Sequence, residues 1–172
     1  MAVIADSSVL VSLVKIGTLG LLKRLYNRIL IPQAVYEEVI IEGKRLRKAG
    51  VATVEKALGD RWIQVVRLKG NQTVNVKRFL ASGGIGRGEA ESLSLAMSRK
   101  LPVIIDDKHA RELAATVNVE YWGTGAVLLE ACVAGLVNRQ EFAAALRELA
   151  RVTWLSAEVT SELLRIAEEV KE

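Results

Sequence analysis

Acidic residues follow two short, strongly apolar runs of the chain. Asp6 comes directly after Ala2–Ala5, and the pair Asp106 and Asp107 comes directly after Pro102–Ile105. Short runs of branched apolar residues are typical of buried strands, and ligands of open α/β sheets bind beyond the carboxyl ends of parallel strands. We therefore expect these three carboxylates to converge at one edge of a sheet.

Two glutamates near the starts of predicted helices could reach the same edge. Glu38 lies in a helix predicted from Gln33 to about Ile41, and Glu89 opens a helix after a glycine-rich stretch. Neighbouring helix residues cannot share a face, so only one of Glu37 and Glu38 can point at the sheet, and the apolar pattern favours Glu38. Glu37 and Glu91 are more typical of a solvated helix surface.

When several carboxylates share one crevice, either their pKa values are raised or they bind divalent cations. The chain has one cysteine, Cys132, and one histidine, His109, which excludes cysteine zinc sites and multi-histidine zinc sites. Oxygen ligands alone favour Mg²⁺ or Mn²⁺, and the chemistry that suits such a cluster is metal-assisted phosphodiester hydrolysis.

Each acid also has a structural explanation. Asp6, followed by two serines, has the form of a helix N-cap, and the cap and the metal site are equally compatible with that stretch alone. Of Asp106 and Asp107, one could cap the next helix while the other is a ligand. The joint placement of these acids at two strand ends favours the metal site.

Strands and helices alternate along the chain, which predicts parallel strands joined by crossovers with helices on both faces of the sheet. The fold class is therefore α/β, a three-layer α/β/α sandwich with additional C-terminal helices. The chain has 172 residues, enough for one compact domain, and we expect a single domain over 1–172. The predicted strands are 2–5, 28–31, 62–66, 102–105 and 119–122.

Residues from about 138 to 172 are expected to form a C-terminal helical extension. Asn138 and Glu141 match a capping box that would begin one helix. A last helix is predicted from about Ala157 to Val170, with an apolar stripe of Val159, Leu163, Ile166 and Val170.

Basic residues are unevenly distributed, although the net charge is only +4. The segments 43–54 and 61–88 contain ten of the 24 basic residues and no acid, so the remainder of the chain is acidic. This pattern suits a polyanion held near a metal site, although charge counting by itself modestly favours a solvated charged surface. The sequence shows neither a signal peptide nor an apolar stretch of membrane-spanning length, so we expect a cytoplasmic protein without a membrane partner.

The chain resembles the PIN domain family, within a prokaryotic branch of PIN-like proteins. The resemblance rests on the order and spacing of five runs, IADSSVLVSLVKIGTLGLLKRLY, IPQAVYEEV, GRGEAESLSLA, VIIDDKHARELA and YWGTGAVLLEACVAGLV. It implies a central parallel sheet with helices on both sides, a cluster of acids that binds Mg²⁺ or Mn²⁺, and cleavage of RNA.

Carried over by position, the resemblance implies four catalytic acids, Asp6, Glu38, Glu89 and Asp107, with Asp106 beside them as a further metal ligand. Ser8 matches a small polar position after the first acid. Many PIN proteins are the toxin halves of VapBC-type toxin–antitoxin pairs and form homodimers, so RNA, an antitoxin protein and a second copy of the chain are the implied partners.

Two positions depart from the family pattern. The third acid is Glu89 where the family more often has aspartate, and Ile105 and Asp106 stand where a hydroxyl usually precedes the last acid. Two hypotheses follow, a metal-dependent endoribonuclease and a PIN-like module that binds RNA or protein without turnover. Aspartyl-phosphate chemistry fits less well, because it would need a second aspartate at position 8, where the chain has serine.

Overall fold

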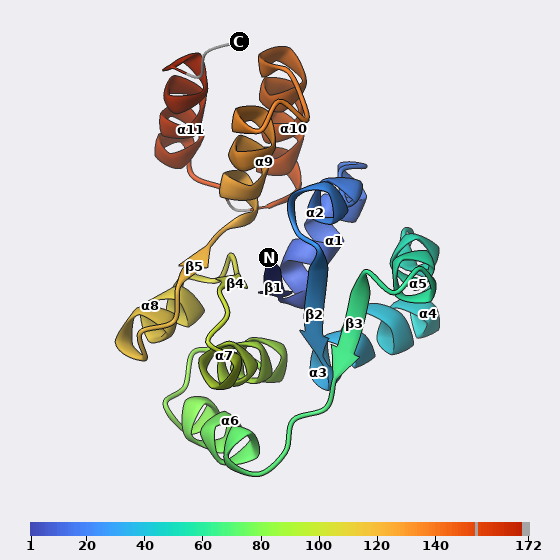
Figure 1. The fold of residues 1–172 in the computed structure, drawn as a ribbon, viewed down its shortest axis with the longest axis vertical. Coiled ribbons are helices and arrows are strands. Elements are labelled where there is room, and N and C mark those ends of the chain that lie inside the picture. Colours follow the sequence, from blue (N-terminus) through green and yellow to red (C-terminus); the bar gives the residue numbers. More distant parts are fainter. Residues whose placement is uncertain (154, 170–172) are drawn as a thin grey trace.

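The computed structural model describes residues 1–153 and 155–169 of the chain, and the described strands form one parallel sheet (Figure 1). The sheet order is β3-β2-β1-β4-β5, so β1 lies at the centre. The strand bounds are β1 (Ala2–Ala5), β2 (Arg28–Pro32), β3 (Ile63–Val66), β4 (Val103–Ile104) and β5 (Tyr121–Trp122). The predicted parallel α/β architecture is confirmed.

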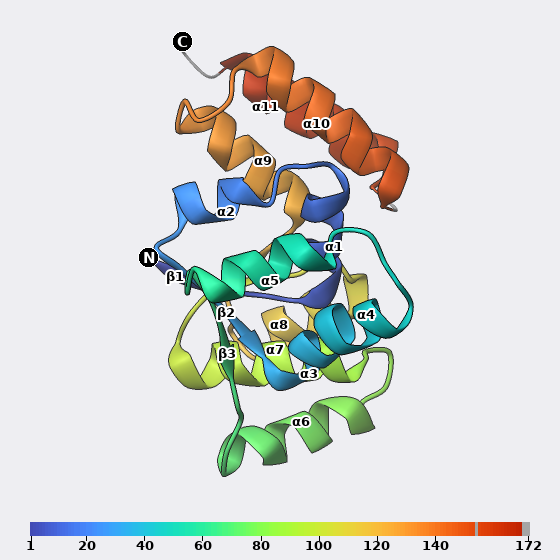
Figure 2. The same ribbon diagram turned by 90° about the vertical axis from the view of Figure 1, so that its right-hand side faces the viewer.

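Helices connect the strands and cover both faces of the sheet (Figure 2). The first helices are α1 (Ser7–Lys15), α2 (Gly20–Leu25), α3 (Gln33–Tyr36), the π-helical segment η1 (Glu37–Glu42), α4 (Gly43–Arg45) and α5 (Val51–Gly59). Those that follow are α6 (Asn71–Ala81), α7 (Arg87–Arg99), α8 (Lys108–Thr116), α9 (Thr124–Val133), α10 (Arg139–Val152) and α11 (Ala157–Glu169). None of the described helices is both long and apolar enough to cross a membrane.

Strand residues alternate between two apolar cores because successive side chains point to opposite faces of a sheet. Val3 and Ala5 of the central strand face a core shared with α1, α2, α5, α9 and α10, and buried Cys132 belongs to the same core. Ile4, between them, faces a second core shared with α6, α7 and α8. The sheet is therefore buried on both sides, as expected for parallel strands.

The C-terminal helices pack on α9, at the end of the molecule opposite α6 and α7 (Figure 1). The capping box at the start of α10 is confirmed, since Asn138 accepts from the Glu141 N–H at 2.9 Å. The predicted stripe of α11 is partly wrong. Leu163 packs against the core, but Val159 is exposed and Ala167 is the buried residue. Val170, the last residue of the predicted stripe, lies outside the described residues.

Candidate active site

The carboxyl ends of β1 and β4 bring Asp6 and Asp106 to the same edge of the sheet. The two strands are neighbours in parallel register, with Ala5 opposite Ile104, and the Asp6 N–H donates to the Ile104 carbonyl at 3.3 Å. Asp6 follows β1 directly and starts α1, whereas Ile105 and Asp106 lie between the end of β4 and Asp107, which starts α8, so the pairing of β1 with β4 places the acids. The expected convergence of Asp6 and Asp106 is therefore present in the structure.

Asp6 is almost completely buried, with 1% of its surface exposed. It is the N-cap of α1 and accepts from the Val9 N–H at 3.0 Å and from the Ser8 hydroxyl at 2.9 Å. Burial raises the pKa of this carboxyl, the negative charges of Asp106 and Glu89 add to the rise and the two hydrogen bonds oppose it, so that the pKa is about 7. Asp6 is thus both a helix cap and a member of an acid cluster.

Asp106 and Asp107 both cap helices, although the sequence suggested that only one would. Asp107 is the N-cap of α8 and accepts from the Ala110 N–H at 2.8 Å. Asp106 reaches the start of α9, where it accepts from the Thr124 N–H at 2.8 Å and from the Thr124 hydroxyl at 2.6 Å. Carboxylates at helix N-termini are stabilised by the exposed N–H groups and the helix dipole.

Glu89 lies in the first turn of α7 and accepts from the N–H of the N-cap residue, Gly86, at 2.9 Å. Its charge reaches Asp6, since it contributes to the raised pKa of that residue. Gly86 therefore serves the entry to this helix.

Glu38 is exposed and projects from η1 towards the start of α1, where its carboxylate accepts from the Ser7 hydroxyl. It also lies against α7, because a Cβ atom built at Gly88 would be 2.9 Å from one Glu38 carboxylate oxygen and 3.0 Å from the other. Ser7 and Gly88 were not singled out in the sequence, since each lies far along the chain from the residue that it contacts.

Gly88→Ala should weaken an activity that depends on Glu38 without weakening the fold. The added methyl must displace the end of a flexible side chain, and displacements of about 1 Å at a reacting centre can cost up to about a hundredfold, so we expect a loss of about tenfold. Alanine should raise helix stability by up to about 1 kcal/mol. Gly59→Ala, in open space at the end of α5, is the matched control for activity assays and thermal denaturation.

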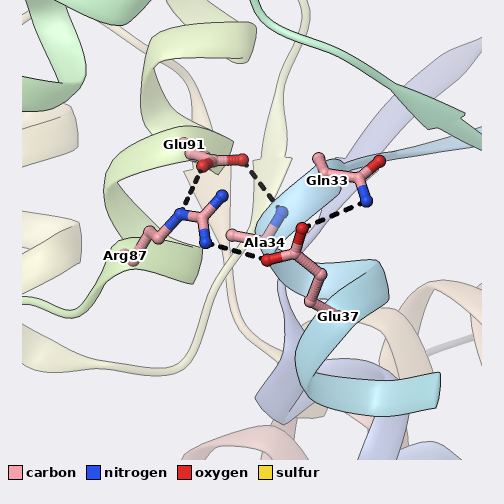
Figure 3. Close-up of polar contacts among 5 residues, drawn as sticks. All are labelled: Gln33, Ala34, Glu37, Arg87 and Glu91. Carbon is pink, nitrogen blue, oxygen red and sulfur yellow. Dashed lines mark hydrogen bonds and ion pairs between the residues drawn. The ribbon is translucent and has the colours of Figure 1, made fainter. Parts of the chain in front are cut away.

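A polar network joins α3 and η1 to α7 (Figure 3). Glu91, only 8% exposed, accepts from the Ala34 N–H at 2.9 Å and from the Arg87 guanidinium at 2.8 Å. The same guanidinium donates to Glu37 at 2.8 Å. The expectation of a solvated Glu91 is wrong, because this carboxylate caps the first turn of α3 from a neighbouring helix. Glu37, also expected in solvent, is partly exposed and ion-paired.

The carboxylates of this cluster offer oxygen ligands for a cation. Among the described residues, no basic side chain neutralises the charge of Asp6. No lysine or arginine among residues 1–153 and 155–169 forms an ion pair with Asp6. Across the same residues, no group of three His, Cys, Asp or Glu side chains is already arranged to hold a metal ion. A buried carboxylate beside two others, with no cation of the chain to offset it, fits a hard divalent cation by donor type and by charge.

Comparison with known proteins is consistent with this architecture. A family model for the PIN domain matches residues 2–169, which include α10 and α11 as well as the sheet. A search of curated proteins finds no match. PIN domains are generally nucleases and typically use divalent metal ions. Since the match spans nearly the whole chain and the sheet is parallel with helices on both faces, the chain belongs to the PIN domain family.

Proposed function

We propose that this protein is an endoribonuclease that requires Mg²⁺ or Mn²⁺ and hydrolyses RNA phosphodiester bonds. The observation that carries the proposal is the buried Asp6 at the carboxyl end of the central strand, close enough to Asp106 and Glu89 for their charges to act on it. Burying a carboxylate beside others costs folding free energy, and a cation that binds there offsets that cost.

Asp6, Glu38, Glu89 and Asp107, with Asp106, are the residues proposed to hold the metal ion. When bound, Mg²⁺ or Mn²⁺ supplies Lewis-acid chemistry, since it lowers the pKa of water and stabilises negative charge on phosphate oxygens. Hydrogen bonds within the chain fix the positions of two of these metal ligands. The Val9 N–H and the Ser8 hydroxyl orient Asp6, and the Ser7 hydroxyl holds the Glu38 carboxylate. No side chain needs to act as a nucleophile in this scheme.

The proposal is tested with labelled single-stranded and structured RNAs incubated with the purified protein in Mg²⁺, in Mn²⁺ and in EDTA. We expect internal cleavage in one or both metals and none in EDTA. Internal rather than terminal products distinguish an endonuclease from an exonuclease. Cleavage that persists in EDTA would contradict the proposed metal requirement.

One observation favours the alternative, a PIN-like module that binds RNA or protein without turnover. Asp106, Asp107 and Glu89 each already accept hydrogen bonds from the start of a helix, so each has a structural role that does not require catalysis. This alternative predicts binding that does not depend on metal and no cleavage product at any Mn²⁺ concentration.

Family resemblance also leads us to propose an antitoxin partner and a homodimer. Both rest on the resemblance alone. Sedimentation of the purified protein reports the homodimer directly, and a monomer at all concentrations would reject it.

A further inference from the structure

An apolar cavity lies directly beside Glu38, between α1, η1 and the start of α5. Its volume is about 310 Å³, which is at the lower end of the range of about 300–1,000 Å³ for small-molecule pockets. Figure 2 shows α5 beside α1. Five valines line the cavity, Val11, Val14, Val39, Val51 and Val54. Because Glu38 is also a lining residue, the cavity borders the candidate active site.

The wall next to α1 depends on a glycine. Gly50 has a φ of +88°, which side chains rarely adopt, and a Cβ atom built there would lie 2.0 Å from Val14 Cγ1. The chain before α5 can therefore approach α1 closely only because residue 50 has no side chain. This close approach forms one side of the cavity.

Two lysines at the cavity have no acidic partner among the described residues. Lys15, at the end of α1, and Lys48, before α5, both line the cavity and form no ion pair there. Two other cations of the basic segment 43–54 are paired, Lys44 with Glu55 at 2.5 Å and Arg45 with Glu42 at 2.5 Å. Lys15 and Lys48 therefore supply the cavity with positive charge that no described acid offsets in an ion pair.

We propose that this cavity is a nucleotide subsite for single-stranded RNA, which takes the base of a nucleotide next to the cleaved bond while Lys15 and Lys48 contact the flanking phosphates. This inference rests on the proposed ribonuclease function. An apolar pocket with two unpaired cations at its edge suits an occupant that is apolar in one part and anionic in another. An unstacked nucleotide has both parts, and aliphatic walls contact a base without selecting its identity.

The proposal is tested by measuring the anisotropy of a labelled single-stranded RNA bound to the full chain in EDTA, where cleavage is not expected. The double variant Lys15→Ala/Lys48→Ala should bind about tenfold more weakly, with the slope of log affinity against log salt reduced by about one per lysine. Lys44→Ala removes one charge from the same basic segment, but its ammonium is already paired, so it should bind like the native protein.

The pocket itself is tested with RNAs that lack one base at successive positions. For the native protein, one abasic position should weaken binding by about tenfold, because the buried apolar contact is lost. Val11→Phe, which fills the cavity, should bind every abasic RNA as it binds the intact one. The abasic series with native protein gives an answer even if Val11→Phe does not fold.

Cleavage assays separate this inference from the proposed function. If the lysine variant and Val11→Phe bind and cleave like the native protein, the subsite is rejected and the ribonuclease stands. If Val11→Phe changes only the sedimentation of the protein, the cavity is a contact between copies of the chain and the subsite is rejected. If the native protein neither binds nor cleaves RNA, the function and the subsite both fail.

Discussion

Asp6→Asn should abolish RNA cleavage while leaving the fold intact. Asparagine keeps the shape of the side chain and an oxygen for the Val9 N–H, but it lacks the negative charge that a divalent cation needs. Metal ions supply several kcal/mol of transition-state stabilisation and each 1.36 kcal/mol is tenfold in rate, so we expect a loss of about a thousandfold or more. Initial cleavage rates in saturating Mn²⁺ measure it.

The same variant should be more stable than the native protein when metal is absent. The pKa of Asp6 is about 7 in the folded protein against the ordinary aspartate value of 3.8 in the unfolded chain, so between pH 4 and 7 the unfolded chain has lost a proton that the folded protein retains. Stability therefore falls as pH rises through this window, and the penalty is complete above pH 7. At pH 8 it amounts to at most about 4 kcal/mol, less the cost of burying an asparagine amide.

Urea denaturation in EDTA at pH 5 and pH 8 measures this difference. The gain in unfolding free energy for Asp6→Asn should be larger at pH 8 than at pH 5. Asp60→Asn is the matched control, because Asp60 is exposed at the end of α5 and the same substitution there should change neither stability nor cleavage. Equal stability of native protein and Asp6→Asn at pH 8 would contradict the burial argument, and full cleavage by Asp6→Asn would contradict the proposed site.

Glu91→Ala should destabilise the protein by about 3 kcal/mol, because it leaves the Ala34 N–H without its acceptor and separates Arg87 from a buried partner. For a chain of this size the melting temperature should fall by roughly 10 °C. A glutamate on a solvated helix surface would change stability by only about 0.5 kcal/mol or less when replaced. Thermal denaturation by circular dichroism distinguishes the two cases.

Two variants control for the loss of charge and of side-chain bulk. Glu91→Gln retains a carbonyl oxygen for the Ala34 N–H but loses the charge that pairs with Arg87, so its stability should lie between those of native protein and Glu91→Ala. Glu112→Ala breaks an exposed pair with Lys108 in α8 and should have little effect. A melting temperature of Glu91→Ala equal to that of Glu112→Ala would reject the structural role.

Glu91 also links the stability of the fold to the positions of the acids in the candidate site. Ala34 begins the continuous helical stretch that carries Glu38, and Glu91 belongs to the helix that carries Glu89. The network in Figure 3 therefore fixes the two helices that bring these acids to the edge of the sheet. Residual cleavage by folded Glu91→Ala should be lower than that of Glu91→Gln.

Local sequence patterns were sufficient to predict the fold class and to predict that Asp6 and Asp106 lie at the same edge of the sheet. Apolar runs define the strands, and parallel strands place the residues that follow them at one edge, so the acid type and position can be recognised without coordinates. Capping signals are local as well, which is why the start of α10 was predicted correctly. These features depend on residues within a few positions of one another.

Only the tertiary structure decided the contacts between segments far apart in the chain. Glu91 caps a helix 57 residues before it, Asp106 caps one 18 residues after it, and Glu38 lies against Gly88 and Ser7. A glutamate on a polar helix position has the same local pattern whether water or a neighbouring backbone N–H meets it. The packing of one helix against another determines whether the carboxylate contacts water or a backbone N–H. This packing depends on side chains throughout both cores.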